Sequence, residues 1–129
     1  MRQTFFHGSR RGAWNPTARL RATVTFTPLH GGAPGIAHGG FVAAAFDQAF
    51  GHLVVYEGLG ALTGQLTVRF LRPTRLREPV TIEAWLDREE GKRVFVVGES
   101  RQGGRLIGQA EATFVEIDRA AMEAMTRPG

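Results

Sequence analysis

The sequence contains no cysteine among its 129 residues. Disulfides, thiolate nucleophiles and cysteine-based metal sites are therefore excluded, and we expect no metal site. Long apolar runs are also missing, because an aspartate, a glutamine and a histidine interrupt the longest one, residues 41–56. A membrane-spanning helix needs about 20 apolar residues, and the N-terminus lacks the apolar segment of a signal peptide. We therefore expect a cytoplasmic protein.

Lysine is almost absent as well. The net charge of +4 comes from fifteen arginines and one lysine, Lys92, against twelve carboxylates. A basic chain suits an anionic partner such as a phosphate group, but arginines on a solvated surface give the same composition. No aromatic-basic stripe or recognition motif accompanies the charge, so we do not expect nucleic-acid binding.

The length and composition are those of one globular domain covering residues 1–129. The chain is long enough to bury a core, and its 43% apolar and 22% charged residues argue against disorder. Alternation of apolar and polar residues predicts several strands. These are residues 20–27, 62–71, 80–86, 93–99 and 105–117.

Turns and breaks separate these strands. In residues 62–71, Leu66 and Val68 alternate with Thr63, Gln65 and further polar residues, which predicts two different faces. The stretches REEGK and RQGGR predict the turns of two hairpins, and Gly108 is a candidate for a bulge in the last strand. The polar tail from Asp118 is expected to fray.

A loop and a long helix lie between the first two predicted strands. Residues 30–40, HGGAPGIAHGG, contain five glycines and one proline and predict a loop. Good helix formers follow, and apolar residues surround the predicted helix, residues 40–56, on nearly all sides. Asp47 is the only carboxylate in the first 56 residues and stands in this helix. A buried carboxylate without a partner is costly, so a special role is expected for it.

The predicted order is strand, helix, then an antiparallel meander of about four strands, which indicates an α+β fold. The compact arrangement is one antiparallel sheet wrapped around the long buried helix.

Four sequence marks stand at defined spacings. They are the run His38-Gly39-Gly40, an aspartate nine residues after the histidine at Asp47, a threonine opening the next strand at Thr63, and Arg72-Pro73 closing that strand. With the strand pattern of residues 20–117, they make the chain resemble the hotdog-fold acyl-CoA thioesterases of the phenylacetic-acid-degradation and thioesterase superfamily member 4 types. Some branches of this family have an asparagine six residues before the histidine, where this chain has Gly32.

The resemblance implies hydrolysis of an acyl-CoA or aryl-CoA thioester. Coenzyme A is then part of the substrate, and no separate cofactor is expected. Asp47 would be the general base or the nucleophile, and the N–H of Gly40 or its neighbour would stabilise the oxyanion at the helix N-terminus. His38 would orient the loop or the substrate carbonyl, and Thr63 would bond Asp47 or position water.

Substrate contacts are expected from Gly39 and Phe41 near the helix start. Arg72 and Arg75 belong to a group of arginines, with Arg69 and Arg77, that could hold coenzyme A phosphates. A purely structural explanation exists for all these positions: a loop histidine bonded to backbone, a threonine favoured in a strand, or arginines on a solvated face.

A homodimer follows from the implied roles. Seven residues of helix separate Gly40 from Asp47 by about 10 Å, so both cannot touch one thioester carbonyl. Two antiparallel helices across a two-fold axis would bring Asp47 of one chain beside Gly40 of the other. The resemblance implies the same shared site, in a dimer or a tetramer.

Two alternatives use the same fold. Asp47 and His52 have the five-residue spacing of hotdog enoyl-CoA hydratases, but five helical residues turn about 500°, so the two side chains point in different directions. A non-catalytic acyl-CoA-binding protein is the second alternative. The sequence does not define the acyl group.

Overall fold

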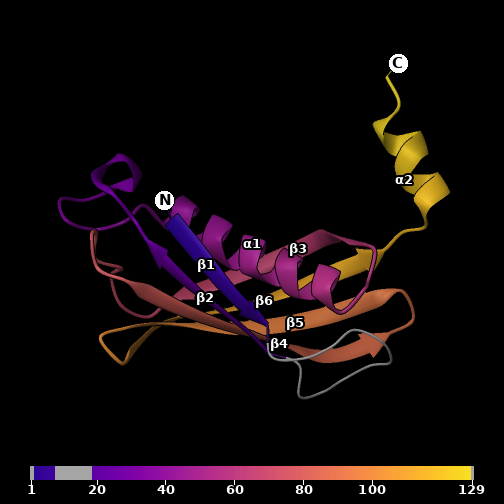
Figure 1. Ribbon diagram of the computed structural model, residues 1–129. Helices are drawn as coiled ribbons and strands as arrows, with labels where there is room; N and C mark the ends of the chain where they lie inside the picture. Colours follow the sequence, from indigo (N-terminus) through magenta and orange to yellow (C-terminus); the bar gives the residue numbers. More distant parts are fainter. Residues whose placement is uncertain (1, 8–18, 129) are drawn as a thin grey trace.

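One antiparallel sheet of six strands carries the long helix α1 on its inner face in the computed structural model, which describes residues 2–7 and 19–128 (Figure 1). The elements are β1 (Arg2–His7), β2 (Arg19–Thr25), a 3-10 turn (Pro28–His30), α1 (Gly39–Tyr56), β3 (Ala61–Phe70), β4 (Val80–Glu90), β5 (Arg93–Gln102), β6 (Arg105–Glu116) and α2 (Arg119–Thr126). The predicted α+β architecture, a hotdog sheet around one long helix, is confirmed.

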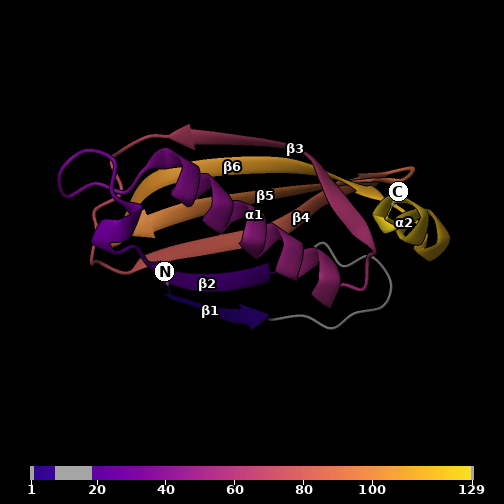
Figure 2. The same cartoon turned by 90° about the horizontal axis from the view of Figure 1, so that it is seen from above.

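The strand order is β1-β2-β4-β5-β6-β3 (Figure 2). The expected four-strand meander is therefore wrong for its first member: β4, β5 and β6 form a meander, whereas β3 pairs with β6 at the far edge. Residues 71–79 carry the chain from that edge back to the middle of the sheet. Arg72, Pro73 and Arg75 of this crossing segment line a pocket at the end of β3.

Helix α1 buries one side only. Its buried side chains are Val42, Ala45, Phe46, Ala49, Phe50, Leu53 and Val54. The other side exposes Gly40, Ala44, Gln48 and Val55, so the expectation of burial on nearly all sides is wrong for the single chain. No helix within residues 2–7 and 19–128 is long and apolar enough to cross a membrane.

A glycine in the sheet lets α1 come close. A Cβ on Gly98 would lie 2.7 Å from Phe50 Cε1 and 2.9 Å from the Glu83 carbonyl oxygen, so only glycine fits there. Phe50 and Phe46 are completely buried against the sheet. Burying a phenylalanine side chain contributes roughly 1.5–3 kcal/mol, so this close approach stabilises the position of α1.

The hairpin turns are shorter than predicted. Strand β4 extends to Glu90 and β5 to Gln102, which leaves two-residue turns at 91–92 and 103–104. Gly91, Gly103 and Gly104 have φ of 58°, 59° and 76°, a region open to glycine at little cost. The predicted irregularity in β6 is present beside Gly108: this glycine pairs with Ser100 and Leu106 with Arg101, so Ile107 is the extra residue.

Both ends contain elements that the sequence did not predict. Strand β1 pairs along β2. The tail expected to fray forms α2, because the Asp118 carboxylate accepts a hydrogen bond from the Ala121 N–H (2.6 Å) and caps the helix. Helix α2 stands away from the sheet (Figure 1).

Candidate active site

The loop before α1 is fixed by hydrogen bonds to two other segments. The His38 N–H donates to the His30 carbonyl (2.7 Å), and the Ala37 N–H donates to the Thr74 carbonyl (2.8 Å). Gly32, at the position of the family's asparagine, packs so closely that a Cβ would lie 3.3 Å from the His38 Cα. In this chain Gly32 allows close packing of the loop backbone, and it has no side chain that could act as the asparagine of other family branches does.

His38 is the N-cap of α1. Its backbone is extended (φ −66°, ψ 135°), and its Nδ1 accepts a hydrogen bond from the Gly40 N–H at 2.9 Å. In the neutral imidazole the proton must then be on Nε2, which is free to donate. The sequence predicted that the N–H of Gly40, or alternatively that of its neighbour, binds the oxyanion. The Gly40 N–H is already hydrogen-bonded to His38.

The neighbouring Gly39 offers the open amide. Its N–H donates to no group in the described part of the chain. Phe70, at the end of β3, lies against it: a Cβ on Gly39 would be 3.2 Å from Phe70 Cζ. The first amide of α1 thus points out of a helix N-terminus, where the aligned peptide dipoles favour negative charge, with an aromatic ring at its side.

Asp47 is oriented by Thr63. The Thr63 hydroxyl donates to Asp47 Oδ1 at 2.8 Å, across from α1 to β3, and Asp47 is half-buried. This pairing was one of the two roles predicted for Thr63. The second carboxylate oxygen makes no hydrogen bond to a side chain of the described residues.

A bulge at Gly64 makes this contact possible. The register shifts between Thr63, which pairs with Phe114, and Gln65, which pairs with Thr113. Phe114 is buried under α1, so Thr63 faces α1 although simple alternation places it on the same face as Gln65. The predicted face of Thr63 was therefore wrong, because one extra residue reverses the alternation.

Phe41 follows the helix start and is 40% exposed. Its ring meets His30 edge-on at 4.7 Å between centroids and lies 6.2 Å from the His38 ring. The predicted substrate-contact residues Gly39 and Phe41 are thus at the same end of α1 as His38, while Asp47 lies about 10 Å further along the helix. One chain does not bring all the predicted groups together.

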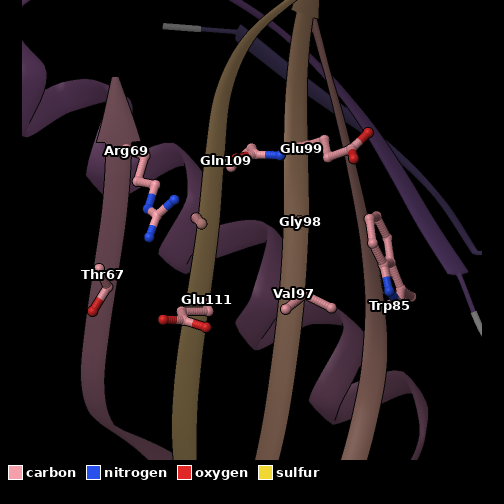
Figure 3. A pocket seen from close by; sticks show the side chains of 9 residues that line it. Thr67, Arg69, Trp85, Val97, Gly98, Glu99, Gln109 and Glu111 are labelled. Atoms are coloured by element: carbon pink, nitrogen blue, oxygen red, sulfur yellow. The ribbon is translucent and has the colours of Figure 1, made fainter. Parts of the chain in front are cut away.

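The arginines divide between two faces. Arg72 and Arg75 line a pocket of about 240 Å³ with Arg105, at the far end of β3. Arg69 instead lines a cavity of about 350 Å³ on the outer face of the sheet and is turned away from α1; Glu111 on the neighbouring strand lines it too, and Trp85 lies at its opposite side (Figure 3). The single group of arginines expected from the sequence is wrong for Arg69, because side chains alternate between the two faces along β3 and that of Arg69 lies on the outer face, whereas Arg72 and Arg75 follow the end of the strand.

Three residues of this region were missed. In the sequence, Phe70 is an apolar strand end and Arg105 is a turn residue. The packing of α1 against β3 brings Phe70 to Gly39, and the pairing of β3 with β6 brings Arg105 into the pocket of Arg72. Gln102, only 3% exposed, joins them through the tight β5–β6 turn. A glutamine next to two glycines carries no sequence signal of burial.

Comparison with known proteins decides the family. The model of the thioesterase superfamily matches residues 34–108. The chain belongs to this superfamily. One relative of this chain is acyl-coenzyme A thioesterase THEM4 of Mus musculus. The two are 32% identical over 89 aligned residues, which make up 67% of this chain and 38% of the relative. The chain thus spans well under half of that relative's length.

Solved structures share the fold. A hypothetical thioesterase from Streptococcus pneumoniae TIGR4 with coenzyme A has a TM-score of 0.76 at 20% identity, over 88% of this chain and 86% of the other. The PaaI protein from the phenylacetic acid degradation operon of E. coli has a TM-score of 0.73 at 21% identity, over 78% and 73%. The resemblance found in the sequence is confirmed.

Proposed function

We propose that the chain hydrolyses acyl-CoA thioesters to a free acid and coenzyme A. The observation that carries this proposal is the 2.8 Å hydrogen bond by which Thr63 orients the Asp47 carboxylate beside the open face of α1. The substrate class is supported by the name of the mouse relative and by the coenzyme A in the pneumococcal structure.

Asp47 has two chemically complete routes. As a general base, it takes a proton from water, the water oxygen attacks the carbonyl carbon, and the C–S bond breaks to release the thiolate, which then takes up a proton. As a nucleophile, it displaces the thiolate and forms an anhydride that water hydrolyses. Neither route uses a separate cofactor.

The Gly39 N–H is the oxyanion donor in this proposal. It is the open amide at the start of α1, whereas the Gly40 N–H is bonded to His38. Donors aimed at a developing negative charge are most effective where water is excluded, and the Phe70 ring beside Gly39 helps to exclude it. The Nε2–H of His38 is a second donor to the carbonyl or to bound water.

A homodimer completes the site. Strand β3 is an edge of the described sheet and has ten residues available for pairing on its free side. Pairing of two β3 strands across a two-fold axis would extend the sheet and place the open faces of two α1 helices antiparallel, so Asp47 of one copy would reach Gly39 of the other. A further pairing into tetramers and a cytoplasmic location stay predictions.

The test combines a substrate panel with one variant. Free thiol released from phenylacetyl-, hydroxybenzoyl-, short-chain and long-chain acyl-CoA is measured for the natural chain and for Asp47→Asn. Loss of a positioned base lowers kcat by roughly 10²- to 10⁴-fold, or about 3–5 kcal/mol in the barrier, with the melting temperature unchanged or raised.

Other outcomes would favour other functions. Coenzyme A binding without thiol release indicates a binding protein, and water addition to an enoyl-CoA indicates a hydratase. A folded Asp47→Asn chain that keeps more than about a tenth of kcat excludes Asp47 as base or nucleophile.

A further inference from the structure

Four aromatic rings contact one another in succession from the core to the start of α1. We call them the aromatic row; in order, they belong to Phe26, His30, Phe41 and His38. Successive ring centroids are 6.0, 4.7 and 6.2 Å apart, and the ring planes meet at 71°, 86° and 78°. These are edge-to-face contacts, a favoured arrangement of aromatic pairs. Phe26 is buried and His38 is exposed, so the row connects the core with the candidate active site.

His30 is fixed in the row by polar contacts. Its Nδ1 accepts a hydrogen bond from the Thr27 N–H at 3.1 Å and lies 3.0 Å from the Thr27 hydroxyl oxygen. Its own N–H donates to the Thr27 carbonyl at 2.8 Å. The side chain thus reaches back to the residue before its turn, as glutamate or glutamine does in a capping box. The imidazole cannot turn away from this orientation without losing the bond to Thr27.

The backbone of His30 holds His38 as well. The His30 carbonyl accepts from the His38 N–H at 2.7 Å, and residues 31–37 between them form a small hairpin in which Gly31 pairs with Ala37. His30 therefore contacts the N-cap of α1 through its backbone and Phe41 through its ring. Both of these partners are expected to contact the substrate.

Phe41 is the member of the row that offers apolar surface. It remains 40% exposed although His30 lies against it, and its ring contacts that of His38, whose Nε2–H is a proposed donor to the thioester carbonyl. An exposed apolar ring beside that carbonyl favours an apolar acyl group, because packing removes both from water. We propose that His30 is a positioning residue for acyl selectivity: it holds the Phe41 ring as a wall against which a bulky apolar acyl group packs. This inference rests on the proposed function.

The experiment compares two variants of His30 on small and bulky substrates. His30→Gln keeps an acceptor for the Thr27 N–H and removes the ring, whereas His30→Phe keeps a ring against Phe41 and removes the acceptor. Acetyl-CoA has an acyl group too small to use the wall, and the bulky substrate is the better one of phenylacetyl-CoA and decanoyl-CoA. His30→Gln should melt close to the natural chain and lose about tenfold in kcat/KM for the bulky substrate, mainly through KM, with less than about twofold change for acetyl-CoA.

Two further variants show whether the ring is responsible. Folded His30→Phe should retain the natural selectivity because the edge-to-face contact remains, although its melting temperature falls with the lost cap. His52→Gln is the matched control and should leave selectivity unchanged: it makes the same exchange at another half-buried histidine, whose ring lies 5.9 Å from that of Tyr56 near the end of α1. The inference is overturned if His30→Gln loses nothing or loses equally on both substrates, if His30→Phe loses as much selectivity as His30→Gln, or if the natural chain hydrolyses acetyl-CoA alone.

Direct binding separates this inference from the proposed function. Calorimetry with the same thioesters on the Asp47→Asn chain needs no turnover. A bulky thioester should bind about tenfold more tightly than acetyl-CoA, and adding His30→Gln should remove most of this difference. A difference in binding that depends on His30, without thiol release by the natural chain, supports the acyl wall and refutes hydrolysis. Hydrolysis without such a difference refutes the acyl wall alone.

Discussion

At the scale of single residues, His38 has one observed role, as the helix cap, and one proposed role, as a donor to substrate or water. As N-cap it satisfies the Gly40 N–H through Nδ1, and its other nitrogen remains available as a donor. Serine, threonine, aspartate and asparagine are the usual caps, so an imidazole in this place leaves a second polar group that those caps lack.

Substitutions of His38 distinguish the two roles. His38→Ala should destabilise the fold by about 0.5–2 kcal/mol because the cap is lost, whereas His38→Asn retains a cap and should unfold close to the natural temperature. If Nε2–H acts on the substrate, both variants lose kcat by at least about tenfold. Thermal melts and thiol release measure the two effects, and a fully active His38→Asn chain would leave His38 as a cap alone.

The Gly39 amide can be removed without changing the backbone. His38 already has the extended conformation that a following proline requires, and proline is well tolerated at the first position of a helix. Gly39→Pro should therefore fold and lose about 10²- to 10³-fold in kcat, as loss of an oxyanion donor does. Gly39→Ala is the control, because it crowds Phe70 in the same way but keeps the N–H; similar losses for both would reject the donor role.

The residues of the site were predicted unequally well. Asp47 was identified as a lone carboxylate in an apolar helix and Thr63 through the family resemblance, and the two side chains are indeed bonded. The choice between the amides of Gly39 and Gly40 depends on one side-chain contact of His38, which no spacing rule reports. Arg105 and Gln102 were missed because only the strand order places them in one pocket with Arg72 and Arg75.

At the scale of elements, β3 shows how one extra residue changes a face. The bulge at Gly64 turns Thr63 toward α1, while Thr67, beyond the bulge, faces the outer cavity. Both threonines have the same parity in the sequence. Without the bulge, Thr63 and Thr67 would face the same side of the sheet, so their opposite orientations result from the extra residue.

Two matched substitutions on β3 test this arrangement. Thr63→Val removes the donor to Asp47 and should lower kcat about tenfold, equal to about 1.4 kcal/mol in the barrier. Thr67→Val removes the same hydroxyl from the other face and should leave kcat unchanged. Both positions are exposed, so the melting temperature should shift little in either variant; equal kinetics for the two would contradict the placement of Thr63.

Periodicity predicted the strands and α1 closely, with boundaries mostly within two residues. It did not predict which strands are neighbours, because alternation describes the faces of a strand and not its partners. The placement of β3 at the far edge and the bulge at Gly64 both depend on long-range pairing. Helix α2 was missed for a local reason, because a polar tail predicts fraying and composition alone does not show that Asp118 caps a helix.

At the scale of the whole molecule, the proposed site needs two chains. Asp47→Asn and Gly39→Pro chains, each inactive alone, should regain activity when mixed, because a heterodimer contains one intact site. Random pairing makes half of the dimers mixed, so about a quarter of the natural activity is expected. Differently tagged chains verify that mixed dimers form. Complete inactivity of these mixed dimers would contradict the shared site.

The open edge of β3 also affects the tendency of the protein to aggregate in solution. In a single copy, the side of this ten-residue strand that faces away from β6 has no partner strand among the described residues, and Leu62 and Phe70 of the same strand are exposed. Such an edge is a template for uncontrolled strand addition and aggregation. Separated copies would therefore be lost to precipitation instead of persisting as inactive monomers, and the lifetime of the protein would increase with its concentration in the range where pairing begins.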